Sequence, residues 1–358
     1  MLTKSKCKVC GESKYISQYL KVCLDCIRNN PEKSINYILE IHGKSRLQFD
    51  LPPEPPQDPK GVKCGWCVND CKIPRNGKGY CGLKINENGK LIHLAGTAEK
   101  GLLEWYYDPL PTNCVADWIC PCRGKYGYKN LAVFYGACTY NCLFCQNWQY
   151  RNLTTIQKPL ITAQGLASKV DDKTSCICYF GGDPTPQLQH AIKTSEIAIS
   201  EEKTNKILRI CWESNGTMSM PFLKKIADLS MESGGIIKFD LKAFNDTLNI
   251  ALCGITNKQT LKNFEWLAKF GKNRQNPHFL CASTLLVPYY VDVEEVKKIS
   301  EFIADLDPTI PYSLLAFNPH FYMRDLQRTT FKHAQDCLYA AKAAGLENVK
   351  IGNINLLW

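Results

Sequence analysis

From about Asn130 to the C-terminus, short apolar runs alternate with amphipathic helical patterns, and this alternation restricts the possible folds more than any other feature. The runs are LAVFYG (131–136), CICYFGG (176–182), ILRICWESNG (207–216), GIIKFDLKAF (235–244), HFLCASTLLVP (278–288), YSLLAF (312–317) and VKIGN (349–353). Helical stripes lie between them, for example at 292–306 and at 331–345, where Gly345 is the expected C-cap. Repeated strand–helix units predict a parallel sheet, but periodicity alone does not separate a barrel from a doubly wound sheet.

Charged and glycine residues end three of these runs, in YFGGDP, WESNG and FDLK. Parallel α/β folds build their sites at the carboxyl ends of the strands. We therefore expect these segments to meet at one functional site.

Three cysteines follow the first apolar run directly: Cys138, Cys142 and Cys145 in GACTYNCLFCQNW, with no fourth cysteine nearby. Three thiolates can bind three irons of a [4Fe-4S] cube and leave the fourth iron free to bind a small molecule. The alternative is a zinc site whose fourth ligand comes from elsewhere in the chain.

At these residues the chain resembles the radical S-adenosylmethionine (radical SAM) superfamily, whose CxxxCxxC loop has this spacing and usually an aromatic residue, here Phe144, before the last cysteine. The resemblance implies an α/β fold with a partial (β/α)6 TIM-type barrel. It also implies that SAM chelates the open iron, and that reductive cleavage of SAM gives a 5′-deoxyadenosyl radical. This radical abstracts a hydrogen atom from the substrate.

The resemblance further implies which residues hold SAM. A GGE-like turn that hydrogen-bonds the SAM ammonium corresponds to GGDP here, with aspartate in place of glutamate, and ESNG and DLK resemble the D-T-N-G and D-L-K segments of pyruvate formate-lyase activating enzymes. A histidine in AFNPHF corresponds to a P-Y-H segment of those enzymes, and Ser283 matches more weakly. The residues carried over are Gly181, Gly182, Asp183, Glu213, Ser214, Asn215, Asp240, Lys242 and His320. Three alternative interpretations remain: ESNG is only a turn, Lys242 is a solvated residue at the end of a strand, and His320 is structural.

Two groups of four cysteines precede this region. The first has paired CxxC knuckles, typical of a zinc ribbon or of rubredoxin-type iron, with zinc preferred: Cys7, Cys10, Cys23 and Cys26. The second can hold a [4Fe-4S] cluster or zinc: Cys64, Cys67, Cys71 and Cys81. Its stretch CGWCVNDCKIPRNGKGYCGLK resembles the N-terminal region of activase-like radical SAM proteins found with Memo-like partners.

A third group is open to two interpretations. Cys114, Cys120 and Cys122 either form an auxiliary cluster or are packed thiols beside a proline turn. The other cysteines are expected to pack in the core as small apolar residues: Cys176, Cys178, Cys211, Cys253, Cys281 and Cys337. Because most of the 20 cysteines lie in close groups, metal coordination is favoured over disulfides.

These segments predict four parts: a metal module at 1–42, a proline-rich linker at 43–62, a cysteine-rich region at 63–129 and a radical SAM core at 130–358. No apolar run is long enough for a membrane span and the N-terminus lacks a signal-peptide core, so we expect no transmembrane segment and a cytoplasmic protein. The formal charge of +10 is scattered, and no nucleic-acid partner is expected.

The expected partners are a reductant such as ferredoxin or flavodoxin and, if the chain acts as an activase, a protein substrate. Substrates of lipid or small-molecule type remain open. The rival hypotheses are a non-enzymatic zinc-ribbon binding protein and an iron–sulfur electron carrier; the second leaves the GGDP, ESNG and DLK segments unexplained.

Overall fold

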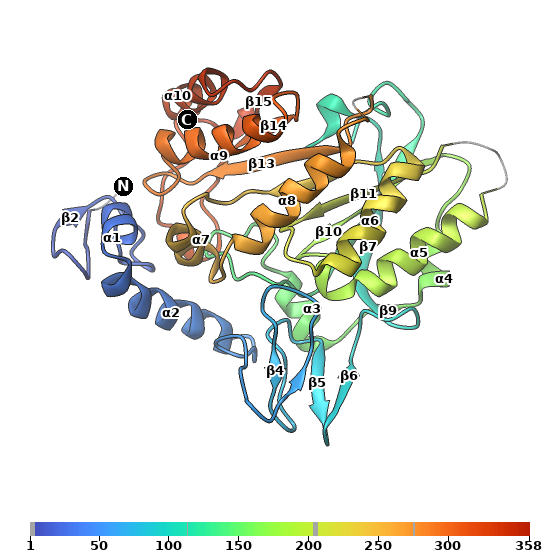
Figure 1. Cartoon of the computed structure of the whole chain (residues 1–358), viewed down its shortest axis with the longest axis horizontal. Helices are drawn as coiled ribbons and strands as arrows, with labels where there is room; N and C mark the ends of the chain where they lie inside the picture. The colour runs from blue at the N-terminus through green and yellow to red at the C-terminus, as the bar shows by residue number, and fades with distance from the viewer. Residues whose placement is uncertain (1–3, 113, 203–206, 275) are drawn as a thin grey trace.

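The computed structural model describes residues 4–112, 114–202, 207–274 and 276–358, and its centre is a nine-stranded sheet (Figure 1). The strand order is β15-β14-β13-β12-β11-β10-β8-β7-β9. Neighbours from β8 to β15 in this order pair in parallel, whereas β7 and β9 join antiparallel at one edge.

All seven runs predicted from the apolar pattern form strands of this sheet. They are β8 (Lys129–Tyr135), β10 (Thr174–Gly181), β11 (Arg209–Ser214), β12 (Ile237–Asp240), β13 (Leu280–Leu286), β14 (Tyr312–Ala316) and β15 (Val349–Gly352). Their order in the sheet follows their order in the chain, without the reversal that marks a doubly wound sheet. The sheet is therefore that of a partial barrel and not a doubly wound sheet.

The helices between these strands form one layer, in which each helix packs against the next across the same face of the sheet (Figure 1). The layer comprises α4 (Ala163–Ala167), α5 (Leu188–Ser200), α6 (Met220–Ser233), α8 (Lys258–Gly271), α9 (Val293–Leu306) and α10 (Phe331–Ala343). The stacked rings of Tyr179 and Trp212 fill the interface, and the Trp212 indole donates to Ser230 of α6. Helix α10 ends with Ala344 as its C-cap, and Gly345, with φ +101°, follows one residue later than expected.

Shorter elements complete the barrel. They are α3 (Tyr150–Ile156), α7 (Asp246–Cys253), β9 (Leu160–Ile161) and the 3-10 turns η1 (Asp117–Ile119), η2 (Thr185–Gln187), η3 (Phe321–Met323) and η4 (Ile354–Leu356). The sequence analysis did not anticipate β7 (Gly101–Pro109), which pairs with β8 although it lies in the predicted cysteine-rich region.

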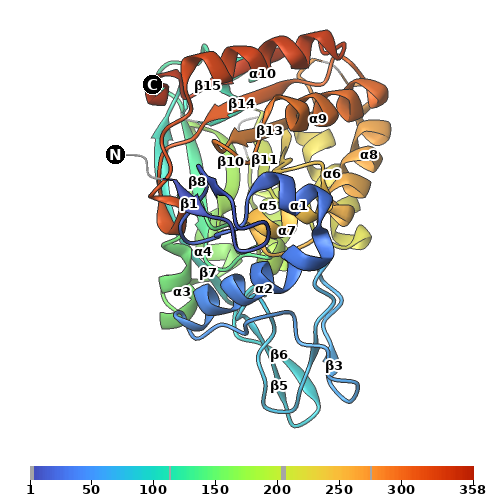
Figure 2. The same cartoon turned by 90° about the vertical axis from the view of Figure 1, so that its left-hand side faces the viewer.

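The N-terminal module lies beside the barrel rather than apart from it (Figure 2). It comprises β1 (Ser5–Lys6), β2 (Ser13–Lys14), α1 (Leu24–Asn29) and α2 (Pro31–Leu47); residues 1–3 of the predicted segment lie outside the described residues. Arg28 donates to both carboxylate oxygens of Asp292, each at 2.7 Å. Helix α2 continues five residues past the predicted boundary at residue 42, because the first proline of the linker stands only at Pro52.

Two small hairpins, which lie between the module and β7 in the chain, project from the barrel (Figure 2). They consist of β3 (Val62–Lys63) with β4 (Lys72–Ile73), and of β5 (Lys84–Glu87) with β6 (Lys90–His93). In the part of the chain that the structure describes, no helix has the length and apolarity needed to cross a bilayer.

Candidate functional site

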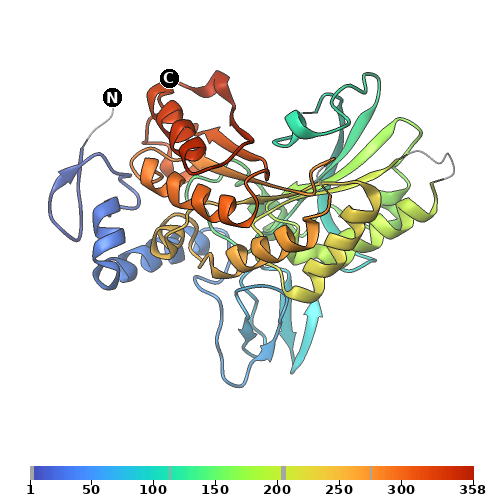
Figure 3. The ribbon, with the colours of Figure 1, turned by 45° about the horizontal axis from the view of Figure 1, so that its top comes forward.

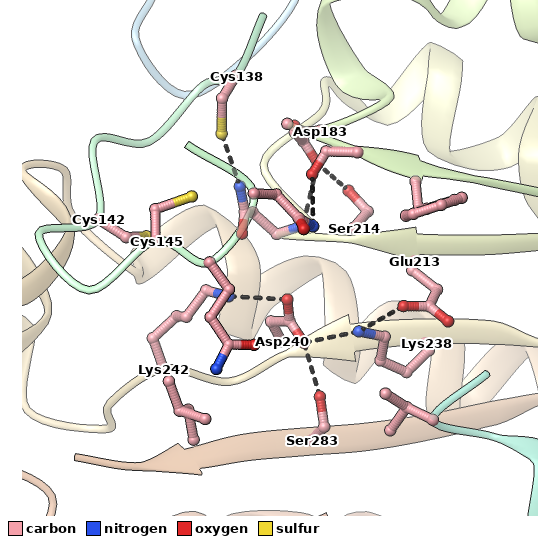
Figure 4. A pocket seen from close by; sticks show the side chains of 18 of the residues that line it. Cys138, Cys142, Cys145, Asp183, Glu213, Ser214, Lys238, Asp240, Lys242 and Ser283 are labelled. Atoms are coloured by element: carbon pink, nitrogen blue, oxygen red, sulfur yellow. Dashed lines mark hydrogen bonds and ion pairs between the residues drawn. The ribbon is translucent and has the colours of Figure 1, made fainter. Parts of the chain in front are cut away.

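A cavity of about 310 Å³ opens at the carboxyl ends of the parallel strands (Figure 4). This is where the sequence places GGDP, ESNG and DLK. The lining residues include Cys138, Cys142, Phe144, Cys145, Gly181, Gly182, Asp183, Glu213, Ser214, Asn215, Lys238, Asp240, Lys242 and Ser283. All the residues carried over from the family resemblance therefore meet at one cavity, except His320.

The three-cysteine loop follows β8 and forms one wall of this cavity. Cys138 and Cys142 are buried, Cys145 is half-buried, and the side-chain amide of Asn215 donates to the Cys138 sulfur at 3.3 Å. Burial raises the pKa of the Cys138 and Cys145 thiols, and a hydrogen bond with Cys253, followed by burial, raises that of Cys142. Thiols of this kind become thiolates when a metal replaces the proton.

The surroundings of Arg151 on α3 indicate whether this wall fits an anionic metal cluster. Its side chain is fully buried; Nη2 donates to Asn141, but Nε and Nη1 have no hydrogen-bond partner. Burial lowers the pKa of Arg151, whereas Tyr150 and the three thiols raise it, with a net increase. A buried cation with unpartnered donors beside three thiols matches a group that carries negative charge. The donor set and this charge fit a cluster bound by three thiolates.

The glycine turn after β10 brings the sheet into contact with the loop. A Cβ atom on Gly182 would lie 2.0 Å from the Ala137 carbonyl oxygen, so only glycine fits without movement of the backbone. The Gly182 amide donates to Tyr135, and the Asp183 amide donates to Ala137. This turn therefore fixes the residue that precedes Cys138.

Asp183 is almost fully buried, and both of its carboxylate oxygens already have partners within the chain. Oδ1 accepts from the Ser214 hydroxyl at 2.7 Å and from the backbone N–H of Asn215 at 3.1 Å, and Oδ2 accepts from the Thr139 hydroxyl at 3.1 Å. Burial raises its pKa, and these hydrogen bonds lower it in part. Asp183 thus joins β10, β11 and the three-cysteine loop; its contact with an ammonium group stays a prediction.

Asp240 is the centre of a charged network on the opposite wall (Figure 4). It accepts from Lys238 at 2.8 Å, from Lys242 at 2.7 Å and from Ser283 at 2.6 Å. Burial raises the pKa of Asp240, but the two lysines lower it more, and the carboxylate stays ionised at neutral pH. Lys242 is thus an ion-paired wall residue and not a solvated strand end.

Lys238 and Arg151 belong to the site but were not predicted from the sequence. Lys238 also pairs with Glu213 at 3.1 Å, and its side chain is 5% exposed. Its position two residues before Asp240, on the same face of β12, is the signal that could have identified it. His320 lies outside the cavity lining and caps η3 through its carbonyl group.

The first two cysteine groups differ in their spacing. In the first, the Cys7 and Cys26 sulfurs are 3.8 Å apart and the Cys10 and Cys23 sulfurs 4.0 Å apart. A tetrahedron with Zn–S bonds of about 2.3 Å has edges of about 3.8 Å, so this spacing fits a single ion.

The second group lines a separate small cavity together with Trp66, Lys84 and Thr139. No three of its four sulfur atoms, all in described residues, lie within 4.8 Å of one another. This wider spacing suits a cube better than a single ion. The Asn69 amide donates to the Thr139 carbonyl at 2.9 Å, so this cavity adjoins the three-cysteine loop. Burial lowers the pKa of Lys84 to about 8, and the neighbouring thiols act in the opposite direction.

His42 connects α2 to the three-cysteine loop and gives the site a pH dependence. It is buried; Nε2 donates to Ala251 at 3.1 Å, and Nδ1 accepts from Asn141 at 3.0 Å. Burial lowers its pKa to about 4. Because the unfolded chain binds this proton near pH 6.5, the stability that neutral His42 provides is lost as the pH falls from 6.5 to 4.

We expect this loss to reach about 3 kcal/mol at pH 4. Thermal unfolding followed between pH 7 and pH 4 should show a smaller acid destabilisation in His42→Gln than in the parent chain. Equal pH dependence of the two proteins would contradict the assignment.

Comparison with known proteins agrees with this geometry. Residues 132–303 match the family model described as the radical SAM superfamily. An uncharacterised protein of Methanocaldococcus jannaschii is 25% identical over 312 residues, covering 83% of each chain. A second protein of that organism, provisionally named a glycyl-radical enzyme activating enzyme, is 29% identical over 147 residues, covering 40% of this chain and 51% of its own length.

Solved structures that match part of the chain include a domain of a pyruvate formate-lyase activating enzyme from Bacteroides vulgatus, with 19% identity and a TM-score of 0.39, covering 49% of this chain and 98% of that domain. Another is Streptococcus suis SuiB bound to S-adenosylmethionine, with 12% identity and a TM-score of 0.43, covering 61% of this chain and 49% of SuiB.

Proposed function

We propose that this chain, which carries a radical SAM domain at residues 132–303, is an enzyme that holds a [4Fe-4S] cluster on Cys138, Cys142 and Cys145 and cleaves SAM reductively. When bound, the cluster supplies the electron that breaks a carbon–sulfur bond of SAM and yields the 5′-deoxyadenosyl radical. The observation that carries the proposal is that three cysteines, among the described residues that line the cavity, face the strand-end carboxylates and lysines.

The chain's own residues have separable tasks in this proposal. Asn215 donates to the Cys138 sulfur and so orients one cluster ligand, while Arg151 offsets the negative charge behind the loop. The Asp240 network presents a positive and a negative group side by side, which suits the carboxylate and ammonium groups of SAM. Buried walls keep water away from a reactive radical.

The four-cysteine group at Cys64, Cys67, Cys71 and Cys81 is proposed to hold an auxiliary [4Fe-4S] cluster. Its cavity shares Thr139 with the three-cysteine loop, so an electron from ferredoxin or flavodoxin has a short route to the radical site. The N-terminal group, with its tetrahedral spacing, is proposed to bind zinc.

The substrate is proposed to be a protein, as for activating enzymes. The name of the second Methanocaldococcus jannaschii relative supports this choice over a lipid or small molecule. A zinc-ribbon binding protein without catalysis would have no use for the charged cavity of about 310 Å³.

Anaerobic reconstitution with iron and sulfide, followed by SAM and dithionite, tests the proposal. The parent chain is expected to form 5′-deoxyadenosine, and Cys142→Ser is expected to form none, because two thiolates do not hold the cluster. Cys337→Ser, a change in a buried thiol of α10 that is not among the cavity's lining residues, is the matched control and should retain activity. Absence of 5′-deoxyadenosine from a parent chain with full iron content would refute the enzyme assignment.

A further inference from the structure

The inner face of the sheet below the cavity carries cysteines where barrels usually carry branched aliphatic residues. Cys176 and Cys178 lie two residues apart on β10 and so share one face. Cys211 of β11 stands directly opposite Cys178 in the strand register, and Cys281 of β13 lies at the same end of the sheet. Cys176 and Cys178 are buried, as the prediction of core packing requires, and together with Cys211 they line one small cavity.

The connection between β7 and β8 lies on the side of the sheet opposite the helix layer (Figure 3), and Cys114, Ala116 and Cys120 of this connection line the cavity. Ala116 of this connection packs against Ile236 and Cys281, and the Trp118 indole donates to Ser313 at 3.0 Å. Cys114 and Cys120 thereby reach the thiols of β10 and β11.

Three ligand atoms converge within this cavity. The sulfurs of Cys114 and Cys178 and a carboxylate oxygen of Glu213 all lie within 4.8 Å of one another, and Cys114 approaches Glu213 Oε1 at 3.3 Å. Among the described residues, the other group with this property is the N-terminal set of four cysteines. The second glutamate oxygen, Oε2, pairs with Lys238, so one oxygen remains directed at the thiols.

The neighbouring thiols have other partners. Cys122 accepts from Arg209 at 3.4 Å, and its amide donates to Cys120. Cys176 donates to Asn130 Oδ1 at 3.3 Å. Cys114 therefore groups with residues from two other elements, Cys178 of β10 and Glu213 of β11, and whether Cys114, Cys120 and Cys122 form a cluster stays open.

We propose that Cys114, Cys178 and Glu213 bind a thiophilic divalent metal ion, with zinc as the expected ion. Two thiolates and a carboxylate are ordinary zinc ligands, and three protein ligands leave the fourth tetrahedral position open, as in catalytic sites. Three further thiols line the same cavity: Cys120, Cys211 and Cys176, the last of which is hydrogen-bonded to Asn130.

The position of this ion suits it to binding a substrate. Glu213 and Lys238 line both this cavity and the larger cavity of about 310 Å³ at the strand ends, so the ion lies in the wall of the larger cavity. An open position there can bind a sulfur, nitrogen or oxygen atom of a substrate and orient it. The metal site itself does not rest on the proposed SAM chemistry.

Metal analysis of the full-length chain tests the proposal. The protein is purified anaerobically, loaded with Zn²⁺, freed of excess metal by gel filtration, and assayed for zinc, iron and sulfide per chain. Cys114→Ser and Cys178→Ser are each expected to hold one zinc fewer than the parent, whereas Cys176→Ser, whose thiol bonds Asn130, holds the same number. Cys114 is half-buried in a loop, so its variant tests the site even if Cys178→Ser fails to fold.

Three outcomes would overturn the proposal. The first is an unchanged zinc content in Cys114→Ser. The second is loss of zinc from Cys176→Ser but not from Cys178→Ser. The third is that protein reconstituted with iron and sulfide loses about four irons with equal sulfide in Cys114→Ser, which would indicate a cube. None of these measurements requires SAM cleavage, so they are independent of the proposed enzymatic activity.

Discussion

Replacing Asp240 with asparagine is expected to lower the melting temperature by about 4 °C and to abolish 5′-deoxyadenosine formation. The carboxylate offsets the charges of Lys238 and Lys242, whose side chains are 5% and 14% exposed. Removing one partner from a buried ion pair costs about 3 kcal/mol or more, because the remaining charge is left desolvated. The two lysines then repel each other at the wall where we place SAM.

Asp336→Asn is the matched control for this change. Asp336 also pairs with a lysine, Lys332 at 2.6 Å, but on the surface of α10, with side chains 45% and 84% exposed. Surface pairs of this kind contribute about 0.5 kcal/mol, and the control should melt within about 1 °C of the parent. Equal melting temperatures of Asp240→Asn and the control would show that the network does not stabilise the site.

Gly182→Ala is expected to cause the second large loss. The new methyl group would meet the Ala137 carbonyl oxygen at 2.0 Å and the Tyr150 ring at 2.8 Å. Both contacts are far inside van der Waals distance, so β10 and the three-cysteine loop must separate. We expect a loss of about 3 kcal/mol and a cluster that is incomplete after reconstitution, because Cys138 follows Ala137 directly.

Gly124→Ala tests whether this effect is specific. No atom lies within 4 Å of the position that its Cβ would occupy, so the control should match the parent in melting temperature and iron content. A Gly182→Ala protein with the parent's iron content and stability would mean that the turn does not position the loop.

The parallel sheet could be predicted from the sequence because buried strands of this class leave a strong mark: runs such as LAVFYG and HFLCASTLLVP, separated by helical stripes. The antiparallel strand β7 could not, because it lies among cysteine and proline segments and its pairing with β8 is a long-range property. The predicted boundary at residue 129 therefore cuts through one sheet.

The cavity at the strand ends was predictable for a similar reason. GGDP, ESNG and DLK each begin at the carboxyl end of a strand, and parallel strands present these ends at one edge. The ion pairs across that edge could not be predicted from the sequence, because the pairing of Lys238 with Glu213 depends on strand register. The convergence of Cys114 with Cys178 joins residues 64 positions apart in the chain, and no spacing rule applies to such a pair.

Binding of SAM to the three-cysteine cluster is tested most directly by the EPR spectrum of the reduced cluster with and without SAM, recorded in a Cys64→Ser and Cys67→Ser background that removes the auxiliary signal. We predict that SAM changes the spectrum, because its amino and carboxylate groups bind the iron that the three cysteines leave open. A fully reduced cluster whose spectrum is the same with saturating SAM would contradict the account.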